Sequence, residues 1–210
     1  MAYFPMFVEL ENKKCLIVGG GKVALRKVMV LQDFGAIIEV VAEDICGEIK
    51  EICSQNTHIT YRENAFLEND LDEIFLVVAA TDDTVLNHEI SVSCKKRGIY
   101  VNAVDQTEDC GFIFPSYIRQ GNVVGAFSSG GQSPVITQYL KNAGKEYLTP
   151  FIGELADFLG SIRSEVKMQV PEEEKRKEIY RGLLQQALAT GKIPEREDWK
   201  GQKEEKIWTE

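Results

Sequence analysis

A glycine-rich turn between an apolar run and a helical pattern constrains this chain more than any other feature. Residues 15–18 are apolar, residues 19–21 are three consecutive glycines, and an amphipathic segment follows at once. Gly19 allows a tight turn, Gly21 lets backbone N–H groups approach a pyrophosphate, and Ala24 is small enough for close packing of helix on strand. This spacing fits the dinucleotide-binding pattern G-x-G-x-x-G/A. An ordinary strand-to-helix turn could also contain three glycines, so the surrounding pattern has to decide.

That pattern is an alternation of short apolar runs and amphipathic segments over residues 14–128, at the spacing of βαβ units. Strands are predicted at residues 15–18, 37–41, 59–61, 75–80 and 100–103. The run 75–80 is apolar throughout, as expected of a central parallel strand that is buried on both faces. Gly35 and Gly98 are the predicted stops of two of the intervening helices. The sequence therefore predicts an α/β fold, a doubly wound parallel Rossmann sheet with strand order 3-2-1-4-5.

Composition narrows the function classes. With 210 residues, 44% of them hydrophobic, the chain can bury one core with an appendage or two smaller ones. A formal net charge of −9 argues against wholesale binding of nucleic acid or of an anionic membrane. Five cysteines without C-x-x-C spacing and two distant histidines indicate reduced thiols and no metal site. No signal peptide or membrane span is recognisable, so we expect a cytoplasmic protein.

Polar residues follow four of the predicted strands, at the sheet edge where doubly wound folds bind ligands. They are the glycine turn, Glu43 with Asp44, Thr81 with Asp82 and Asp83, and Asn102 with Asp105. Glu43 and Asp44 lie somewhat beyond the roughly 20-residue offset at which a carboxylate takes the ribose 2′-OH. They would repel a 2′-phosphate, which favours NAD over NADP. Alternatively, Asp44 and Asp83 cap the following helices and Glu43 is a solvated turn residue.

A second glycine- and serine-rich loop follows a strand predicted at residues 123–127. Residues 128–134 lead into a helix, with Ser133 as its N-cap and Pro134 at its first position. Such a loop at a helix N-terminus can bind an anion. It could equally be a flexible connector with an ordinary Ser-Pro cap.

The last third of the chain has helical periodicity. Apolar stripes run over residues 152–166 and 179–188, and residues 194–210 are mostly charged, so we expect a frayed tail. The basic side chains of these helices alternate with acidic ones. They either form pairs on a solvated face, such as Glu173 with Lys177, or make a carboxylate-binding surface.

Five blocks of sequence, in order, resemble one family. They are residues 5–7 leading to 15–27, then 79–83, 102–105, 112–116 and 128–134. In these blocks the chain resembles the precorrin-2 dehydrogenase and sirohydrochlorin ferrochelatase family, the siroheme-forming module that also occurs as the N-terminal part of some siroheme synthases. The resemblance implies NAD-dependent oxidation of precorrin-2 to sirohydrochlorin, a tetrapyrrole. Some members then insert ferrous iron, as a substrate, to give siroheme; the sequence leaves that second step open.

The resemblance also implies an organisation. Residues 1–111 would form the NAD-binding Rossmann domain, residues 112–148 a dimerisation and substrate-loop segment, and residues 149–210 a helical domain with a charged tail. The chain would be a homodimer and the stand-alone form of the enzyme, dependent on precorrin-2 made elsewhere.

Roles carry over by position. Asp105 would be the catalytic residue, since one carboxylate beside the cofactor can accept the proton lost with hydride transfer, and pyrrole protons during metal insertion. The cofactor would be held by Gly19, Gly21, Lys22, Val23 and Ala24 at the pyrophosphate, by Glu43 and Asp44 at the ribose, and by Thr81 near the nicotinamide. The substrate would be held by Asn102, Ser129 and Gly130. No metal ligands are expected. Asp105 could instead be a plain turn residue.

Two departures from the family pattern stand out. Glu43 occupies a position where relatives often carry proline, and Asp109-Cys110-Gly111 is an unusual lead into Phe112. A different functional class also fits the glycine turn: a Rossmann module that senses NAD or NADH and regulates a partner through its C-terminal helices, without chemistry. Such a sensor would need neither the acid at position 105 nor the loop at residues 128–134.

Overall fold

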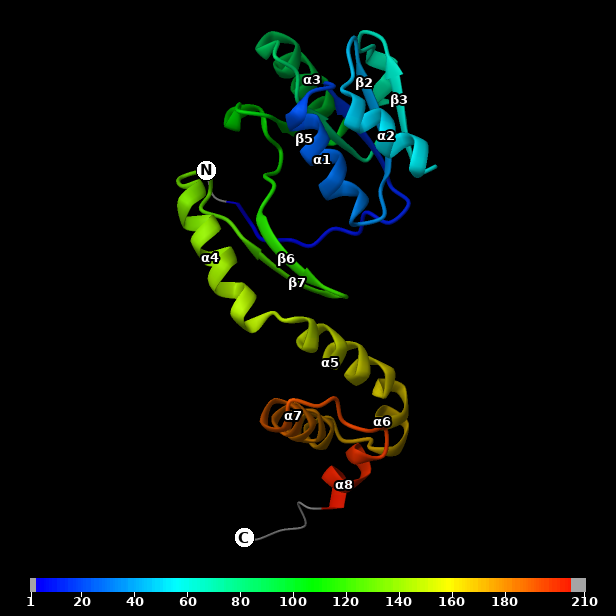
Figure 1. The fold of residues 1–210 in the computed structure, drawn as a ribbon, viewed down its shortest axis with the longest axis vertical. Coiled ribbons are helices and arrows are strands. Elements are labelled where there is room, and N and C mark those ends of the chain that lie inside the picture. Colours follow the sequence, from blue (N-terminus) through cyan, green and yellow to red (C-terminus); the bar gives the residue numbers. More distant parts are fainter. Residues whose placement is uncertain (1–2, 205–210) are drawn as a thin grey trace. The chain divides into compact units, whose positions relative to one another are not determined.

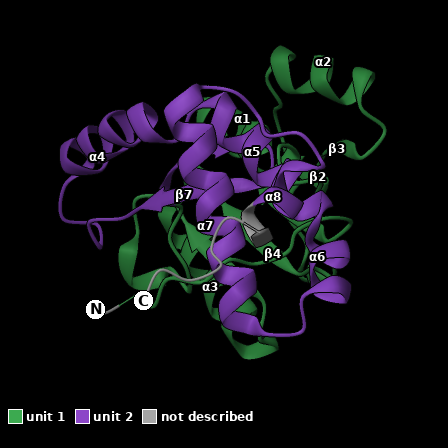
Figure 2. Ribbon diagram, turned by 90° about the horizontal axis from the view of Figure 1, so that it is seen from below, with its two compact units in different colours: residues 1–114 green, residues 115–210 purple. Residues whose placement is uncertain are grey.

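The computed structural model describes residues 3–204 and divides into two compact units, Met1–Phe114 and Pro115–Glu210 (Figure 2). The boundary lies at Phe114, close to the predicted boundary at residue 111. The further division predicted at residue 148 stays a prediction.

The first unit contains a five-stranded parallel sheet (Figure 1). Its strands are β1 (Lys14–Val18), β2 (Ile37–Ala42), β3 (Ile59–Glu63), β4 (Leu76–Ala79) and β5 (Tyr100–Ala103). They lie in the order β3-β2-β1-β4-β5, which confirms the predicted topology. Val18 pairs with both Val41 and Ala79, and Ala79 pairs with Ala103. The strands therefore end level with one another, and the loops that follow them meet at one edge.

Helices cover both faces of this sheet because successive strand residues point to opposite sides. In β1, Cys15 and Ile17 pack into a core with α1 (Lys22–Gln32) and α2 (Gly47–Gln55), whereas Leu16 and Val18 pack into a second core with α3 (Thr84–Arg97). Burying each of the aliphatic side chains Leu16, Ile17 and Val18 contributes about 1.5–3 kcal/mol. Two 3-10 turns, η1 (Glu68–Leu71) and η2 (Thr107–Asp109), complete the unit.

The predicted glycine stops are confirmed. Gly98 has φ +71° and its N–H donates to the carbonyls of Cys94 and Lys95, which closes α3. Gly35 has φ +73° in the turn after α1. Both positions lie in the left-handed region that glycine adopts most easily.

Over residues 115–204, the second unit joins a hairpin to five helices. The hairpin pairs β6 (Ser116–Gln120) with β7 (Val123–Phe127) in antiparallel register, and the latter is the strand predicted at residues 123–127. The helices are α4 (Pro134–Tyr147), α5 (Pro150–Ser161), α6 (Arg163–Gln169), α7 (Glu173–Thr190) and α8 (Asp198–Glu204). The buried cluster of the helical part contains Ile162, Val166, Val170, Ile179, Leu183 and Trp199.

Two expectations for this region need correction or refinement. The stripe over residues 152–166 belongs to two helices, because the helix is interrupted at Ile162, which is the C-cap of α5 and the N-cap of α6. The prediction of a frayed tail from residue 194 is wrong for residues 198–204, which form α8. Trp199 of α8 is fully buried, and Gln186 Nε2 of α7 donates to Asp198 Oδ2 at 3.0 Å. Residues 205–210 lie outside the described part. None of the helices within residues 3–204 is long and apolar enough to span a membrane.

Candidate cofactor and active site

The glycine turn has a geometry that only glycine satisfies at its first position. Gly19 has φ +124°, and its N–H donates to the carbonyl of Val41 at 2.8 Å. A Cβ placed on Gly19 would lie 2.3 Å from the carbonyl oxygen of Ala80. The turn after β1 therefore packs directly against the chain leaving β4, as the tight turn predicted at Gly19 requires.

Gly20, which sequence reasoning did not single out, is confined more tightly. Its Cβ would lie 2.0 Å from the carbonyl oxygen of Asp44 and 2.8 Å from Cα of Ile45, and its own carbonyl accepts from the N–H of Cys46 at 3.0 Å. The dinucleotide pattern treats the residue between its first two glycines as variable. Here that residue binds the turn to the loop after β2.

Gly21 is open by contrast. Nothing lies within 4 Å of where its Cβ would be, and as N-cap of α1 it provides no side chain. The first bond of the turn runs from the N–H of Leu25 to the carbonyl of Gly21 at 3.0 Å. The N–H groups of Lys22, Val23 and Ala24 precede it and point out of the helix end. Free donors at the positive end of a helix dipole, beside space that a side chain would fill, fit a pyrophosphate.

The two acids after β2 lie beside this turn. Glu43 and Asp44 are both exposed. The N-cap of α2 is Cys46, without a side-chain cap bond, so Asp44 is not the helix cap that the alternative interpretation required. The backbone of Asp44 touches Gly20. Its carboxylate remains available at the sheet edge, and its role at a ribose stays a prediction.

Thr81 is held in place by a buried asparagine. The Thr81 hydroxyl donates to Oδ1 of Asn87 at 2.8 Å, and Nδ2 of Asn87 donates to the carbonyl of Thr81 at 3.0 Å. Asn87 is 1% exposed. Asp83 caps α3 by accepting from the N–H groups of Val85 and Leu86, which confirms the capping interpretation there. Sequence reasoning missed Asn87; the available signal was an amide at a core-facing position of the helix.

Asp105 lies in the loop after β5 with a left-handed backbone, φ +60°. On one side the N–H of Val104 donates to the carbonyl of Ala79 at 2.9 Å, and on the other the N–H of Gln106 donates to the carbonyl of Ala103 at 3.3 Å. Aspartate adopts this conformation more readily than most non-glycine residues, and Asn12 and Glu73 share it in other turns of the same unit. The Asp105 side chain is exposed. The loop thus presents a carboxylate at the same edge as Thr81 and the glycine turn.

Asn102 is turned inward. It is 8% exposed, and its Nδ2 donates to the carbonyl of Phe112 at 3.0 Å and approaches Sγ of Cys110 at 3.4 Å. These contacts fix the chain that leaves the first unit. Substrate binding by Asn102 remains a prediction, and its side-chain nitrogen is already used within the unit.

Ser129 and Gly130 belong to the second unit. The Ser129 hydroxyl accepts from the N–H of Ser133 at 2.9 Å and donates to its carbonyl at 3.1 Å, and the N–H of Gly130 donates to Oγ of Ser128 at 3.0 Å. Ser133 caps α4 through the N–H of Ile136, with Pro134 next, as predicted. The loop is therefore internally bonded. Whether Ser129 and Gly130 contact substrate stays a prediction.

Cys15 and Cys94 are buried thiols, and Cys46, Cys53 and Cys110 are half-buried. Burial raises the pKa of Cys15 and of Cys94 to about 12, and it also raises the pKa of Cys110. A thiol with a raised pKa carries little of the reactive thiolate at neutral pH. Among residues 3–204 no three His, Cys, Asp or Glu side chains gather as a metal site would require.

Lys27, a further residue that sequence reasoning did not select, lies at the edge of this region. Its ammonium is 3.7 Å from the centre of the Phe114 ring. Burial, followed by the charge of Arg26, lowers the pKa of Lys27. The contact joins α1 to the end of the first unit by a cation–π interaction.

Comparison with known proteins agrees with this arrangement. Residues 6–116 match the profile of a family described as "Putative NAD(P)-binding". The chain belongs to this family. Residues 152–192 match a second profile, described as the sirohaem synthase dimerisation region. That match falls on α5–α7, whereas the dimerisation segment was predicted at residues 112–148; which residues form a dimer contact stays a prediction.

Curated relatives are siroheme synthases. The chain is 37% identical over 201 residues to the siroheme synthase of Photorhabdus laumondii, covering 94% of this chain and 43% of that protein. It is 38% identical over 198 residues to that of Thioalkalivibrio sulfidiphilus, covering 94% and 40%. The chain thus spans less than half the length of these relatives. The predicted resemblance to the siroheme-forming family is confirmed.

A solved structure shares the fold. SirC, a precorrin-2 dehydrogenase, superposes with a TM-score of 0.72 at 22% identity, covering 97% of this chain and 100% of that one. At this identity the likeness establishes the fold. The likeness covers residues of both units, since 97% of this chain is matched.

Proposed function

We propose that this protein catalyses the NAD-dependent oxidation of precorrin-2 to sirohydrochlorin. One observation carries the proposal: the loop after β5 presents the exposed Asp105 carboxylate at the sheet edge that also holds the glycine turn and Thr81. The NAD(P)-binding family and the siroheme synthase relatives support the same reaction.

The residues present fit NAD. The free N–H groups of Lys22, Val23 and Ala24 would bind the pyrophosphate, and the open position at Gly21 leaves room for it. Glu43 and Asp44 would accept hydrogen bonds from a ribose and would repel a 2′-phosphate. NAD, when bound, supplies the acceptor for the hydride that leaves the substrate.

Asp105 would act as the base that accepts the proton lost by the substrate. Oxidation of precorrin-2 removes a hydride and a proton, so a base is needed where the hydride leaves. The exposed Asp105 carboxylate can accept that proton and release it to water. A carboxylate placed in this way contributes about 10²–10⁴-fold to the rate.

The enzyme interpretation is tested by mixing purified protein with anaerobic precorrin-2 and NAD and following NADH and the tetrapyrrole spectrum. We expect both NADH and sirohydrochlorin to form. Asp105→Asn should keep wild-type NAD affinity and lose turnover by about 100-fold or more. Glu108→Gln, an exposed acid in the same loop, is the matched control. NAD binding without any NADH or sirohydrochlorin would favour the sensor over the enzyme.

Ferrous iron insertion is a second activity that the same carboxylate could support. Two pyrrole protons must leave when a metal enters sirohydrochlorin, and Asp105 could accept them. Iron would be a substrate, and adding it to sirohydrochlorin with and without protein measures the step. A rate equal to the protein-free rate would limit the protein to dehydrogenation.

We also propose that the protein acts as a homodimer and that the loop at residues 128–134 contacts the carboxylates of the tetrapyrrole. Gly130 and Gly131 have φ +63° and +85° and open space around them, so an anion can approach the backbone there. The apolar side chains of α4 support the dimer, because Val135, Ile136 and Tyr139 are exposed. A phosphate on Ser129 would repel a substrate with several carboxylates.

A further inference from the structure

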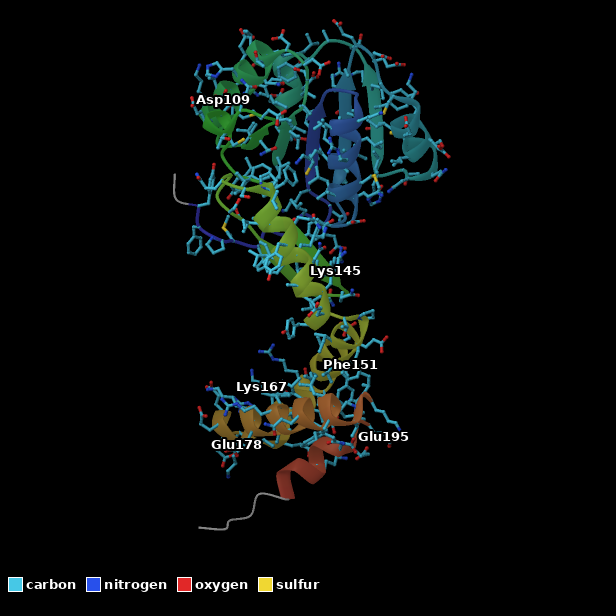
Figure 3. All side chains as sticks on the ribbon, turned by 60° about the vertical axis from the view of Figure 1, so that its left-hand side comes forward. Asp109, Lys145, Phe151, Lys167, Glu178 and Glu195 are labelled. Atoms are coloured by element: carbon cyan, nitrogen blue, oxygen red, sulfur yellow. The ribbon has the colours of Figure 1, made fainter. Side chains whose placement is uncertain are left out.

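One face of α3 is bonded along its length to the loop that carries Asp105. The α3 residues are Thr84, His88, Ser91 and Lys95, and the loop residues that they meet are Gln106, Glu108 and Asp109. The α3 positions are spaced by four, three and four residues, which places them on one side of a helix. The loop is therefore tied to a rigid element, and Figure 3 labels Asp109 beside that helix.

Asp109 is the centre of these contacts. Its Oδ1 and Oδ2 lie 2.8 Å and 3.0 Å from Nδ1 of His88, and Oδ2 is 3.4 Å from Nε2 of Gln106. Because a carboxylate only accepts, the His88 ring nitrogen donates. The backbone carbonyl of Asp109 accepts from the Ser91 hydroxyl at 2.5 Å. The Asp109 side chain is 14% exposed, so little water competes for it.

Gln106 connects the contacts of Asp109 and α3 to the backbone of Asp105, its neighbour in the chain. Its Nε2 donates to the carbonyl of Thr84 at 3.0 Å, and its Oε1 is buried without a hydrogen-bond partner. The contacts of Nε2 with the Thr84 carbonyl and with Oδ2 of Asp109 therefore orient the side chain. Because Gln106 directly follows Asp105, the same contacts restrict the left-handed backbone there.

We propose that Asp109, held by His88, is a positioning residue for Asp105. The inference rests on the proposed function, since it assigns to the pair the placement of the proposed base. The His88 side chain is 58% exposed, so the pair itself adds little to the stability of the fold. Its effect is on geometry. An error of about 1 Å in placing a reacting group can lower a rate by up to about 100-fold.

The experiment compares Asp109→Ala, Asp109→Asn and His88→Ala with Glu89→Gln, an exposed α3 residue that serves as the matched control. We expect Asp109→Ala to lower kcat about tenfold with KM for NAD and the melting temperature near wild type. Asp109→Asn should recover most of kcat, because its amide oxygen can still accept from His88. The double variant Asp109→Ala with His88→Ala should be no worse than Asp109→Ala alone.

A second measurement needs no turnover. Amide hydrogen exchange at residues 104–106 of the free protein should be faster in Asp109→Ala than in Glu89→Gln. Wild-type kcat and exchange in Asp109→Ala would overturn the inference. So would a parallel loss of kcat, NAD affinity and melting temperature that Asp109→Asn does not rescue. If wild-type protein forms no NADH from precorrin-2, the proposed function fails, and unchanged exchange is then the result that overturns the positioning role.

Discussion

At the scale of single residues, the glycine turn separates two functions that the sequence pattern merges. Gly20 has no space for a Cβ because the backbone of Asp44 and Ile45 lies against it, whereas Gly21 has open space and an extended backbone that alanine can adopt. Gly20 is therefore needed for the fold. At Gly21 the absence of a side chain matters only for the approach of a ligand.

This difference predicts opposite outcomes for two alanine substitutions. Gly20→Ala should lower the free energy of unfolding by about 1–3 kcal/mol, because the added methyl group must displace backbone. Gly21→Ala should leave unfolding unchanged and weaken NAD binding about tenfold, or about 1.4 kcal/mol. Urea unfolding and calorimetric titration with NAD measure the two effects. Equal losses of stability in both variants would contradict the assignment.

Sequence reasoning located the residues of this site better than it assigned their contacts. The periodicity of apolar runs was enough to place Gly19, Thr81 and Asp105 after adjacent strands, because strand order follows from βαβ handedness. It could not distinguish Asp83, which caps α3, from Asp44, which caps nothing. Asp44 lies too early to cap α2 because its backbone packs against Gly20 and the helix begins only after Cys46. That packing is a tertiary contact, which periodicity does not show.

At the scale of elements, α8 shows where periodicity fails. The helix is only seven residues long, Asp198–Glu204, and is rich in charge, so no apolar stripe identifies it. Trp199 inserts into the cluster formed by α6 and α7, and Asp198 accepts a hydrogen bond from Gln186 of α7. The long stripe on α7 was predictable because several of its turns each contribute an apolar residue.

Trp199 should accordingly be the main stabilising residue of α8. Trp199→Ala should lower the free energy of unfolding by about 3–5 kcal/mol, because it leaves a cavity the size of an indole. Trp199→Phe should cost less than Trp199→Ala, because the phenyl ring fills part of that cavity. The indole Nε1 is buried without a hydrogen-bond partner in the described part of the chain, so its loss breaks no bond. Met168→Ala, an exposed control on α6, should be neutral in the same urea titration.

At the scale of the whole molecule, each unit has its own core, and apolar surface is left over in the second. The helix α4 contains no buried residue, and Val135, Ile136, Tyr139, Leu140 and Tyr147 on it are exposed, with Val135 76% exposed. A second apolar surface lies on α7, within the residues that match the dimerisation profile, where Leu188 is exposed. A second copy of the chain could cover either face.

Charge substitution distinguishes the two faces. If α4 forms the contact, Val135→Glu should shift the protein from dimer to monomer in analytical ultracentrifugation, because a buried unpaired carboxylate costs several kcal/mol at an interface. Leu188→Glu and the polar control Gln138→Glu should then remain dimeric, and all three variants should keep the wild-type circular dichroism spectrum. Dissociation by Leu188→Glu with an intact Val135→Glu dimer would place the contact on α7 instead. A wild-type protein that sediments as a monomer at micromolar concentration would exclude the homodimer, and the apolar face of α4 would then need another partner.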